Sequence, residues 1–172
     1  LVMQGWALAM TGDLSAGIAL MEQGLAGWQA TGQILLRNYF YALLAEGYAL
    51  AGRTTEGLAL VMTGQALVAT CDDHFYRAEL YRLQGDLLLA QGEVFEEVEI
   101  AYRKAIEIAR QQSEKLLELR AAIGLARLWQ RQGRATEAYQ RLAEIYGWFT
   151  EGFDTADLVA AKELLAELGR NC

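Results

Sequence analysis

The stretch Tyr41–Gly64, YALLAEGYALAGRTTEGLALVMTG, decides the fold that the sequence predicts. Large apolar residues recur in it at spacings of three and four, as in Tyr41, Leu44 and Tyr48, and such spacings place side chains on one face of a helix. Gly52 interrupts the pattern, and glycine readily adopts the left-handed conformation found where helices end. The stretch therefore predicts two amphipathic helices joined by a tight turn.

The same pattern recurs along the chain. Glycines at the expected turns are spaced 40, 40 and 41 residues apart: Gly12, Gly52, Gly92 and Gly133. Small or apolar residues follow these turns at nearly the same spacing: Gly17, Gly57, Val98 and Ala138. Internal similarity at a constant period is typical of solenoid proteins, in which each unit stacks on its neighbours.

The sequence therefore predicts an all-α, right-handed helical-repeat solenoid of about four helix pairs with a C-terminal capping helix. We expect a single domain over residues 1–172, with repeats at about 1–31, 32–71, 72–113 and 114–152 and the capping helix at about 154–169. The helix pairs are expected at 1–11 with 14–30, 34–51 with 54–70, 74–91 with 94–112, and 115–132 with 135–149.

Composition and charge exclude several classes of protein. Hydrophobic residues make up 53% of the chain and charged residues 22%, so the chain has enough apolar surface for a core. Proline is absent, which suits uninterrupted helices. The net charge of −7 argues against a nucleic-acid or anionic-membrane partner. No apolar run reaches the roughly 18 residues that a membrane span needs, so we also predict no membrane association.

The two cysteines, Cys71 and Cys172, form no metal or disulfide pattern, and a cytoplasmic location is the default expectation. Because the sequence begins at Leu1 with a shortened first repeat, we expect it to be part of a longer protein. Residues 1–70 contain only six charged residues. We predict that these apolar N-terminal repeats are partly covered and allow partial homodimerisation.

Aromatic residues at helical spacing are expected mainly between helices. Trp148 and Phe149 lie near the end of a second helix, and we expect them to be buried under the last helix. An exposed pair would instead mark a contact site.

The repeat pattern resembles the tetratricopeptide repeat (TPR), a helix–turn–helix unit usually of 34 residues. The resemblance rests on a large residue, a Leu followed by Gly or Ala, and a Tyr in the first helix, with small, aromatic and small positions in the second. The clearest matches are Tyr41, Leu44, Ala45, Tyr48, Gly57, Val61 and Gly64, followed by Tyr81, Gly85, Leu88, Val98, Tyr102 and Ala105. The longer unit and the absence of proline depart from the family pattern.

Two stretches are similar to a particular group of TPR proteins. Tyr146–Leu168 and AELYRLQGDLLLAQG in the third repeat look like the C-terminal repeat regions of large bacterial signalling proteins. Those proteins carry a signalling ATPase module, often with a nucleotide cyclase or a DNA-binding regulator domain. The resemblance implies a non-catalytic protein- or peptide-binding scaffold. Alternatives are an effector-binding sensor coupled to an ATPase or cyclase module, and a self-association module.

In TPR arrays the first helices line a concave groove, and the resemblance implies which residues line it here. Carried over by position, the candidates are Tyr39, Glu46, Glu79, Arg82, Asp86, Arg120, Arg127 and Arg131. The row of arginines suits an acidic peptide or partner or an anionic small molecule, because a guanidinium can hold a carboxylate through two hydrogen bonds. A solvated helix face with internal Arg–Glu pairs remains an equal alternative.

Two further motifs resemble reactive sites. Gly47–Thr54 nearly matches a phosphate-binding loop, but a helix is predicted before it and Arg53 replaces the lysine. The segment 71–74 joins cysteine, aspartates and His74, yet zinc sites need more ligands at defined spacing. His74 is the only histidine, which excludes most general-base schemes. We predict no catalytic residues, cofactor or metal, and no enzyme activity.

Overall fold

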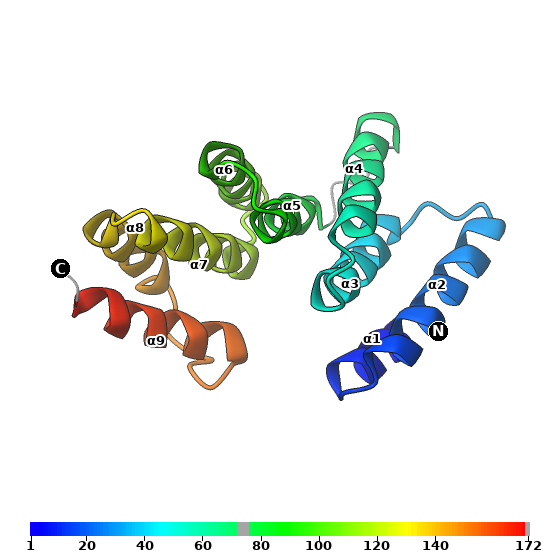
Figure 1. The fold of residues 1–172 in the computed structure, drawn as a ribbon, viewed down its shortest axis with the longest axis horizontal. Coiled ribbons are helices and arrows are strands. Elements are labelled where there is room, and N and C mark those ends of the chain that lie inside the picture. The colour runs from blue at the N-terminus through cyan, green and yellow to red at the C-terminus, as the bar shows by residue number, and fades with distance from the viewer. Residues whose placement is uncertain (72–75, 171–172) are drawn as a thin grey trace.

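A computed structural model describes residues 1–71 and 76–170, and these ranges contain nine helices and no strand (Figure 1). The helices are α1 Val2–Met10, α2 Leu14–Ala30, α3 Arg37–Leu50, α4 Thr54–Cys71, α5 Arg77–Gln91, α6 Phe95–Gln111, α7 Lys115–Arg131, α8 Ala135–Tyr146 and α9 Ala156–Gly169. The prediction of an all-α helical-repeat solenoid is confirmed. Among the described residues, no helix is long and apolar enough to cross a membrane.

Glycine forms the turn inside each helix pair. The four turn glycines all have φ between 72° and 118°: Gly12, Gly52, Gly92 and Gly133. This left-handed conformation costs other L-residues roughly 1–2 kcal/mol but is open to glycine. The regularly spaced glycines in the sequence therefore mark the positions at which the chain reverses direction.

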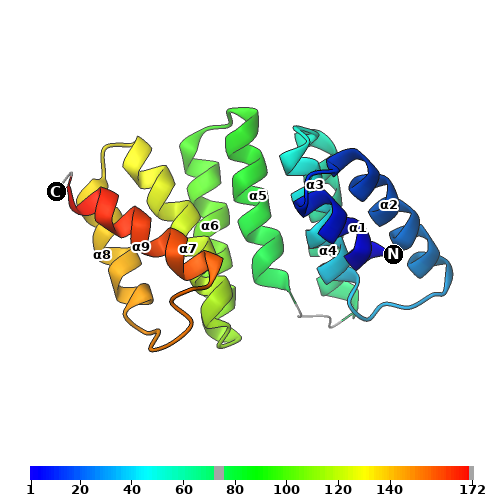
Figure 2. The same ribbon diagram turned by 90° about the horizontal axis from the view of Figure 1, so that it is seen from below.

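The helices form an inner and an outer layer. In the described chain, α1, α3, α5, α7 and α9 contact one another in succession, whereas α2, α4, α6 and α8 contact only odd-numbered helices. The outer helices are therefore splayed apart, and the array curves around its inner layer. In Figure 1, α4 and α6 lie along the upper edge and α1 and α9 along the lower edge; from below, in Figure 2, α1 and α9 cross in front of the others.

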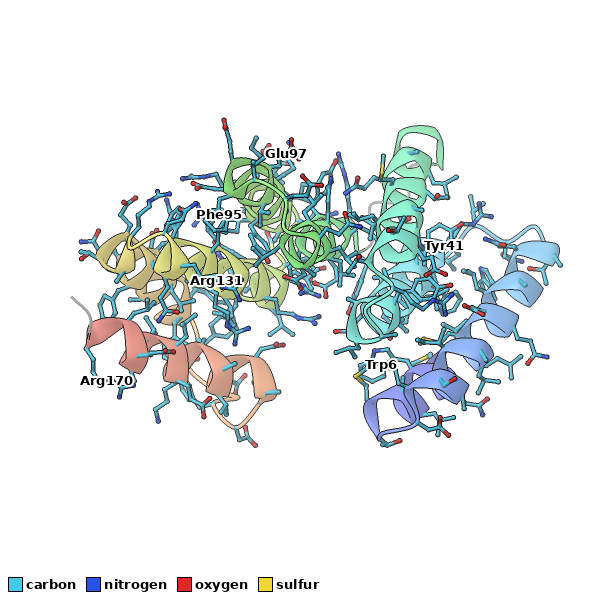
Figure 3. The ribbon with its side chains drawn as sticks, viewed as in Figure 1. Trp6, Tyr41, Phe95, Glu97, Arg131 and Arg170 are labelled. Carbon is cyan, nitrogen blue, oxygen red and sulfur yellow. The ribbon has the colours of Figure 1, made fainter. Side chains whose placement is uncertain are left out.

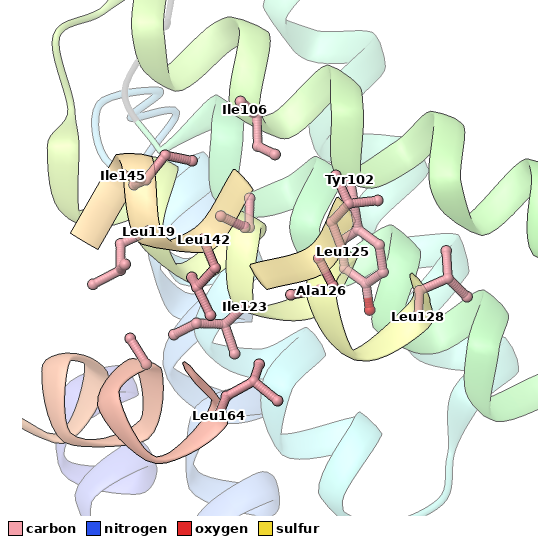
Figure 4. Packing of buried hydrophobic residues seen from close by; sticks show 14 of the residues in the cluster. Tyr102, Ile106, Leu119, Ile123, Leu125, Ala126, Leu128, Leu142, Ile145 and Leu164 are labelled. Carbon is pink, nitrogen blue, oxygen red and sulfur yellow. The ribbon is translucent and has the colours of Figure 1, made fainter. Parts of the chain in front are cut away.

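Each second helix has a fully buried side chain at the same position of the repeat. These residues are at most 1% exposed and are spaced 40, 41 and 40 residues apart: Met21, Val61, Tyr102 and Leu142. The Tyr102 ring packs between Gly85 of α5 and Gly124 of α7, and a Cβ atom on either glycine would lie 2.7 or 2.5 Å from it. Tyr102 belongs to the larger apolar cluster shown in Figure 4.

The apolar core has two main clusters. One is formed by α1 to α5 and the other by α6 to α9. At the C-terminal end, Leu158, Leu164 and Leu168 of α9 are buried in the same cluster as Leu142 and Ile145 of α8. Helix α9 therefore covers the last repeat.

Three local expectations were wrong. Helices α3 and α5 begin at Arg37 and Arg77, not at residues 34 and 74, because Leu36 and Tyr76 before them adopt left-handed conformations with φ 63° and 61°. Helix α8 ends at Tyr146, so Trp148 lies in the following turn and is 62% exposed, although Phe149 packs against the core. The predicted burial of Trp148 is therefore not observed.

The close contact at Tyr102 generates a stability prediction. Gly124→Ala should lower the free energy of unfolding by about 1–3 kcal/mol, because the added methyl overlaps a buried ring. Gly27→Ala is the matched control, since Gly27 is helical and has open space around its Cβ position; this change should raise stability by up to about 1 kcal/mol. Urea unfolding measures both variants. Equal stabilisation by the two changes would contradict the packing described.

Candidate functional site

Arg120 of α7 is the centre of an ion-pair network on the concave face. Its Nη1 lies 2.7 Å from Glu79 Oε1 of α5, and its Nη2 lies 3.5 Å from Glu46 Oε1 of α3. Its Nε lies 3.6 Å from Asp157 Oδ1 of α9. One guanidinium therefore connects four inner helices.

Helix α1 joins the same network. The Trp6 indole donates a hydrogen bond of 2.8 Å from Nε1 to Glu46 Oε2, so polar contacts extend from α1 to α9. Trp6, labelled in Figure 3, projects from α1 on the inner side of the array. The network thereby links the first helix of every repeat.

Arg82 of α5 anchors the buried part of this network. Its Nη2 donates to Glu79 Oε1 at 2.9 Å, and its Nη1 donates to Asp86 Oδ2. Glu79 is 3% exposed and Arg82 is 9% exposed. Burial by itself would lower the pKa of Arg82, but the carboxylates of Glu79 and Asp86 outweigh it and hold that pKa above its usual range. Arg82 therefore remains a cation beside a buried carboxylate.

Tyr102 of α6 completes this part of the site. Its hydroxyl donates a 2.6 Å hydrogen bond to Asp86 Oδ1. Burial, together with the neighbouring Asp86 carboxylate, raises the pKa of Tyr102 well above its usual range. The hydroxyl therefore stays protonated, and both oxygens of Asp86 accept hydrogen bonds.

Arg127 and Arg131 of α7 differ from the other groove arginines. Both side chains are exposed, and neither forms an ion pair with another described residue. They line a crevice of about 340 Å³ between α5 and α7, with Asp86, Leu89, Ala90, Tyr102 and Gly124. We call this the α5–α7 crevice; Arg131 is labelled in Figure 3.

A smaller hollow continues from the crevice toward α9. It has a volume of about 150 Å³ and is lined by Arg82, Asp86, Arg120, Ile123, Gly124, Arg127, Asp157 and Ala160. Arg127, Asp86 and Gly124 border both cavities. The crevice and the hollow therefore form one continuous depression along the inner face of α7.

Tyr39 lies apart from the crevice. Its ring makes edge contact with Tyr76 at a centroid distance of 4.8 Å and a tilted contact with Phe40 at 5.8 Å. Five of the eight candidate residues therefore belong to one network: Glu46, Glu79, Arg82, Asp86 and Arg120. Arg127 and Arg131 form no ion pair with a described residue. Tyr39 lies in an aromatic contact at the α3–α5 junction.

Sequence reasoning missed three members of the site. Trp6 stands one repeat before Glu46, so subtraction of the 40-residue period could have found it. The repeat pattern identifies Tyr102 as a packing residue but does not indicate its hydrogen bond to Asp86. Asp157 lies on α9, outside the repeats, and no period points to it.

Only one of the two reactive-looking motifs lies in the described part of the chain. The segment 47–54 spans the end of α3 and its turn, and Arg53 pairs with Glu22 at 3.2 Å and Glu56 at 2.6 Å. Residues 72–75, including His74, lie outside the described residues. No group of three or more potential metal ligands occurs among those described.

Loss of Arg120 should destabilise the array. Arg120→Ala leaves buried Glu79 with only Arg82 as a cationic partner, and we expect a loss of about 2 kcal/mol, below the 3–5 kcal/mol typical of fully broken buried pairs. Arg141→Ala is the control, because Arg141 has one exposed partner, Glu144 at 3.3 Å, and should cost less than about 1 kcal/mol. Chemical unfolding compares the two. Equal losses would show that the network contributes little.

Comparison with solved structures identifies the fold. A protein of Podospora anserina described as a kinesin light chain with nearly identical TPR-like repeats, and a form of it with a single substitution, match 99% of this chain and 84% of their own, with TM-scores of 0.72 and 0.73 and 20% sequence identity. No family model matches the sequence, and no curated protein is significantly similar to it. At this identity the likeness shows the fold alone, which is a TPR-like helical-repeat solenoid.

Proposed function

We propose that the chain is a protein- or peptide-binding scaffold and that the α5–α7 crevice receives an acidic segment of the partner. The observation that carries this proposal is the contrast among the groove arginines. Arg82 and Arg120 are compensated by carboxylates within the chain, whereas Arg127 and Arg131 are exposed and form no ion pair with a described residue.

The spacing of these two arginines suits a pair of carboxylates. Arg127 and Arg131 are four residues apart on one helix, and such residues are neighbours with Cβ atoms about 5–6 Å apart. Each guanidinium can form two parallel hydrogen bonds to a carboxylate. Leu89 and Ala90 add apolar lining beside them. A segment with two acidic side chains and a small apolar residue would match this surface.

We infer binding without chemical turnover. The acidic group of the crevice, Asp86, already accepts hydrogen bonds from Arg82 and Tyr102, and the remaining charged groups there are arginines. Arginine stays protonated at physiological pH and does not act as a general base. These groups favour recognition of an anion.

We propose further that the scaffold belongs to a larger cytoplasmic bacterial signalling protein. The support is the resemblance of Tyr146–Leu168 and of the third repeat to the C-terminal regions of such proteins. The concave face would then recruit a partner to the attached signalling module.

An anionic effector is the second candidate for the same crevice. Its volume of about 340 Å³ falls within the range of roughly 300–1,000 Å³ found for small-molecule sites. Thermal stabilisation by a dicarboxylate such as succinate, with no binding of acidic peptides, would favour this effector role over the scaffold.

Charge reversal of the two exposed crevice arginines tests the scaffold proposal. Arg127→Glu with Arg131→Glu should weaken binding of the acidic decapeptide (Glu-Ala)₅ at least tenfold, as measured by fluorescence anisotropy at low salt, because attraction becomes repulsion. Lys104→Glu with Arg141→Glu makes the same change in net charge on the outer helices α6 and α8 and should have little effect. Equal affinities of the two double variants would refute the crevice as the binding site.

A further inference from the structure

We propose that α1 carries a second interaction surface, separate from the concave groove, which receives an amphipathic helix from outside residues 1–172. The surface is formed by Leu1, Met3, Gln4, Ala7 and Leu8, and we call it the α1 edge face. The helix that fits it carries a large apolar residue between two small residues.

All five residues of the α1 edge face are exposed, including Leu1 at 58%, Met3 at 61% and Leu8 at 36%. The equivalent residues one repeat later are buried or half-buried: Tyr41, Leu43, Leu44, Gly47 and Tyr48. The equivalents in α5 and α7 are also buried or half-buried: Tyr81, Leu83, Gln84, Leu87, Leu88, Ala122, Gly124, Leu125, Leu128 and Trp129. The first repeat thus exposes a face that the other three repeats cover.

In α3 the equivalent face packs against the preceding second helix, α2. The Tyr48 hydroxyl donates to Glu22 Oε1 of α2 at 2.8 Å, and Gln29 of α2 donates to the Tyr41 hydroxyl at 3.1 Å. Gly47 lies directly against the Met21 side chain. The α1 edge face therefore corresponds to the face of α3 that packs against the preceding second helix.

The same arrangement recurs in α7. Gly124 packs on Tyr102 of α6, and the guanidinium of Arg103 of α6 lies 5.2 Å from the centroid of Trp129. Equivalent positions in two repeats therefore contact a preceding second helix through the same face.

The chemistry of the proposed helix follows from the helices that pack against the equivalent face of the later repeats. Their inward residues repeat as small, large apolar and small at i, i+4 and i+7: Gly17, Met21 and Gly24; Gly57, Val61 and Gly64. In α6 the set is Val98, Tyr102 and Ala105, all buried. Helix α1 contains no charged residue, so the facing side of its partner is apolar as well.

The described residues of a second copy of this chain include no free helix of that kind. The second helix at the C-terminal end, α8, would have to continue the array, but α9 already covers Leu142 and Ile145. The corresponding residues of α2, α4 and α6 are buried within their own array. A helix of a different segment is therefore the occupant that we propose, and a face-to-face pair of α1 helices is the competing outcome.

Helix α6 supplies a probe for this surface. A peptide of residues 94–112, with a hydrocarbon staple joining the exposed positions 100 and 107, presents Val98, Tyr102 and Ala105 on its other face. Titration into the ¹⁵N-labelled full chain should shift amide signals of α1 and α2. A peptide carrying Tyr102→Asp should bind at least tenfold more weakly.

Chain variants locate the contact. Ala7→Glu places a charge at the centre of the α1 edge face and should weaken peptide binding at least tenfold, with unchanged circular dichroism. Met62→Glu is the control, because Met62 is 61% exposed on α4 and should not matter.

Three results would overturn the proposal: no binding of the stapled peptide, equal binding to both variants, or a concentration-dependent dimer in sedimentation that Ala7→Glu abolishes and the peptide does not displace. The Arg127 and Arg131 variant should bind the stapled peptide normally, which separates this surface from the concave groove.

Discussion

The packing of one second-helix side chain between two first helices is the contact on which the array depends. Met21 lies against Gly5 of its own repeat and Gly47 of the next, and Tyr102 lies between Gly85 and Gly124 in the same way. Because glycine has no side chain, the helices approach closely at these points. The first helices then form a continuous inner layer, and a side chain as long as arginine can reach helices of neighbouring repeats.

The charge pattern of the inner face follows from that close approach. Trp6, Glu46, Asp86 and Arg127 occupy equivalent positions in successive repeats, as do Tyr39, Glu79 and Arg120. Acidic residues in the second and third repeats are compensated by Arg82 and Arg120. Helix α9 supplies Asp157 to Arg120. Arg127 and Arg131 have no ion pair among the described residues.

The sequence predicted the features that depend on its period. The turn glycines, the alternation of first and second helices and the shared face of Glu79, Arg82 and Asp86 all follow from spacings of 40 and of three to four residues. It did not predict which arginine is compensated, because the carboxylates that pair with Arg120 come from three other helices: Glu46, Glu79 and Asp157. It also misplaced Trp148, because the expected helix ran on to residue 149, past Gly147, which is the residue that caps α8. Features made by contacts between unlike elements leave no periodic signal.

Acidic ligands are proposed to bind on the inner face, beside Arg127 and Arg131. A photo-crosslinking amino acid can be placed at Ala90, which lines the crevice, and separately at Gln140 on the outer helix α8. With the acidic decapeptide bound, we expect a crosslink from position 90, lost at high salt, and none from position 140. A crosslink from position 140 alone would contradict it.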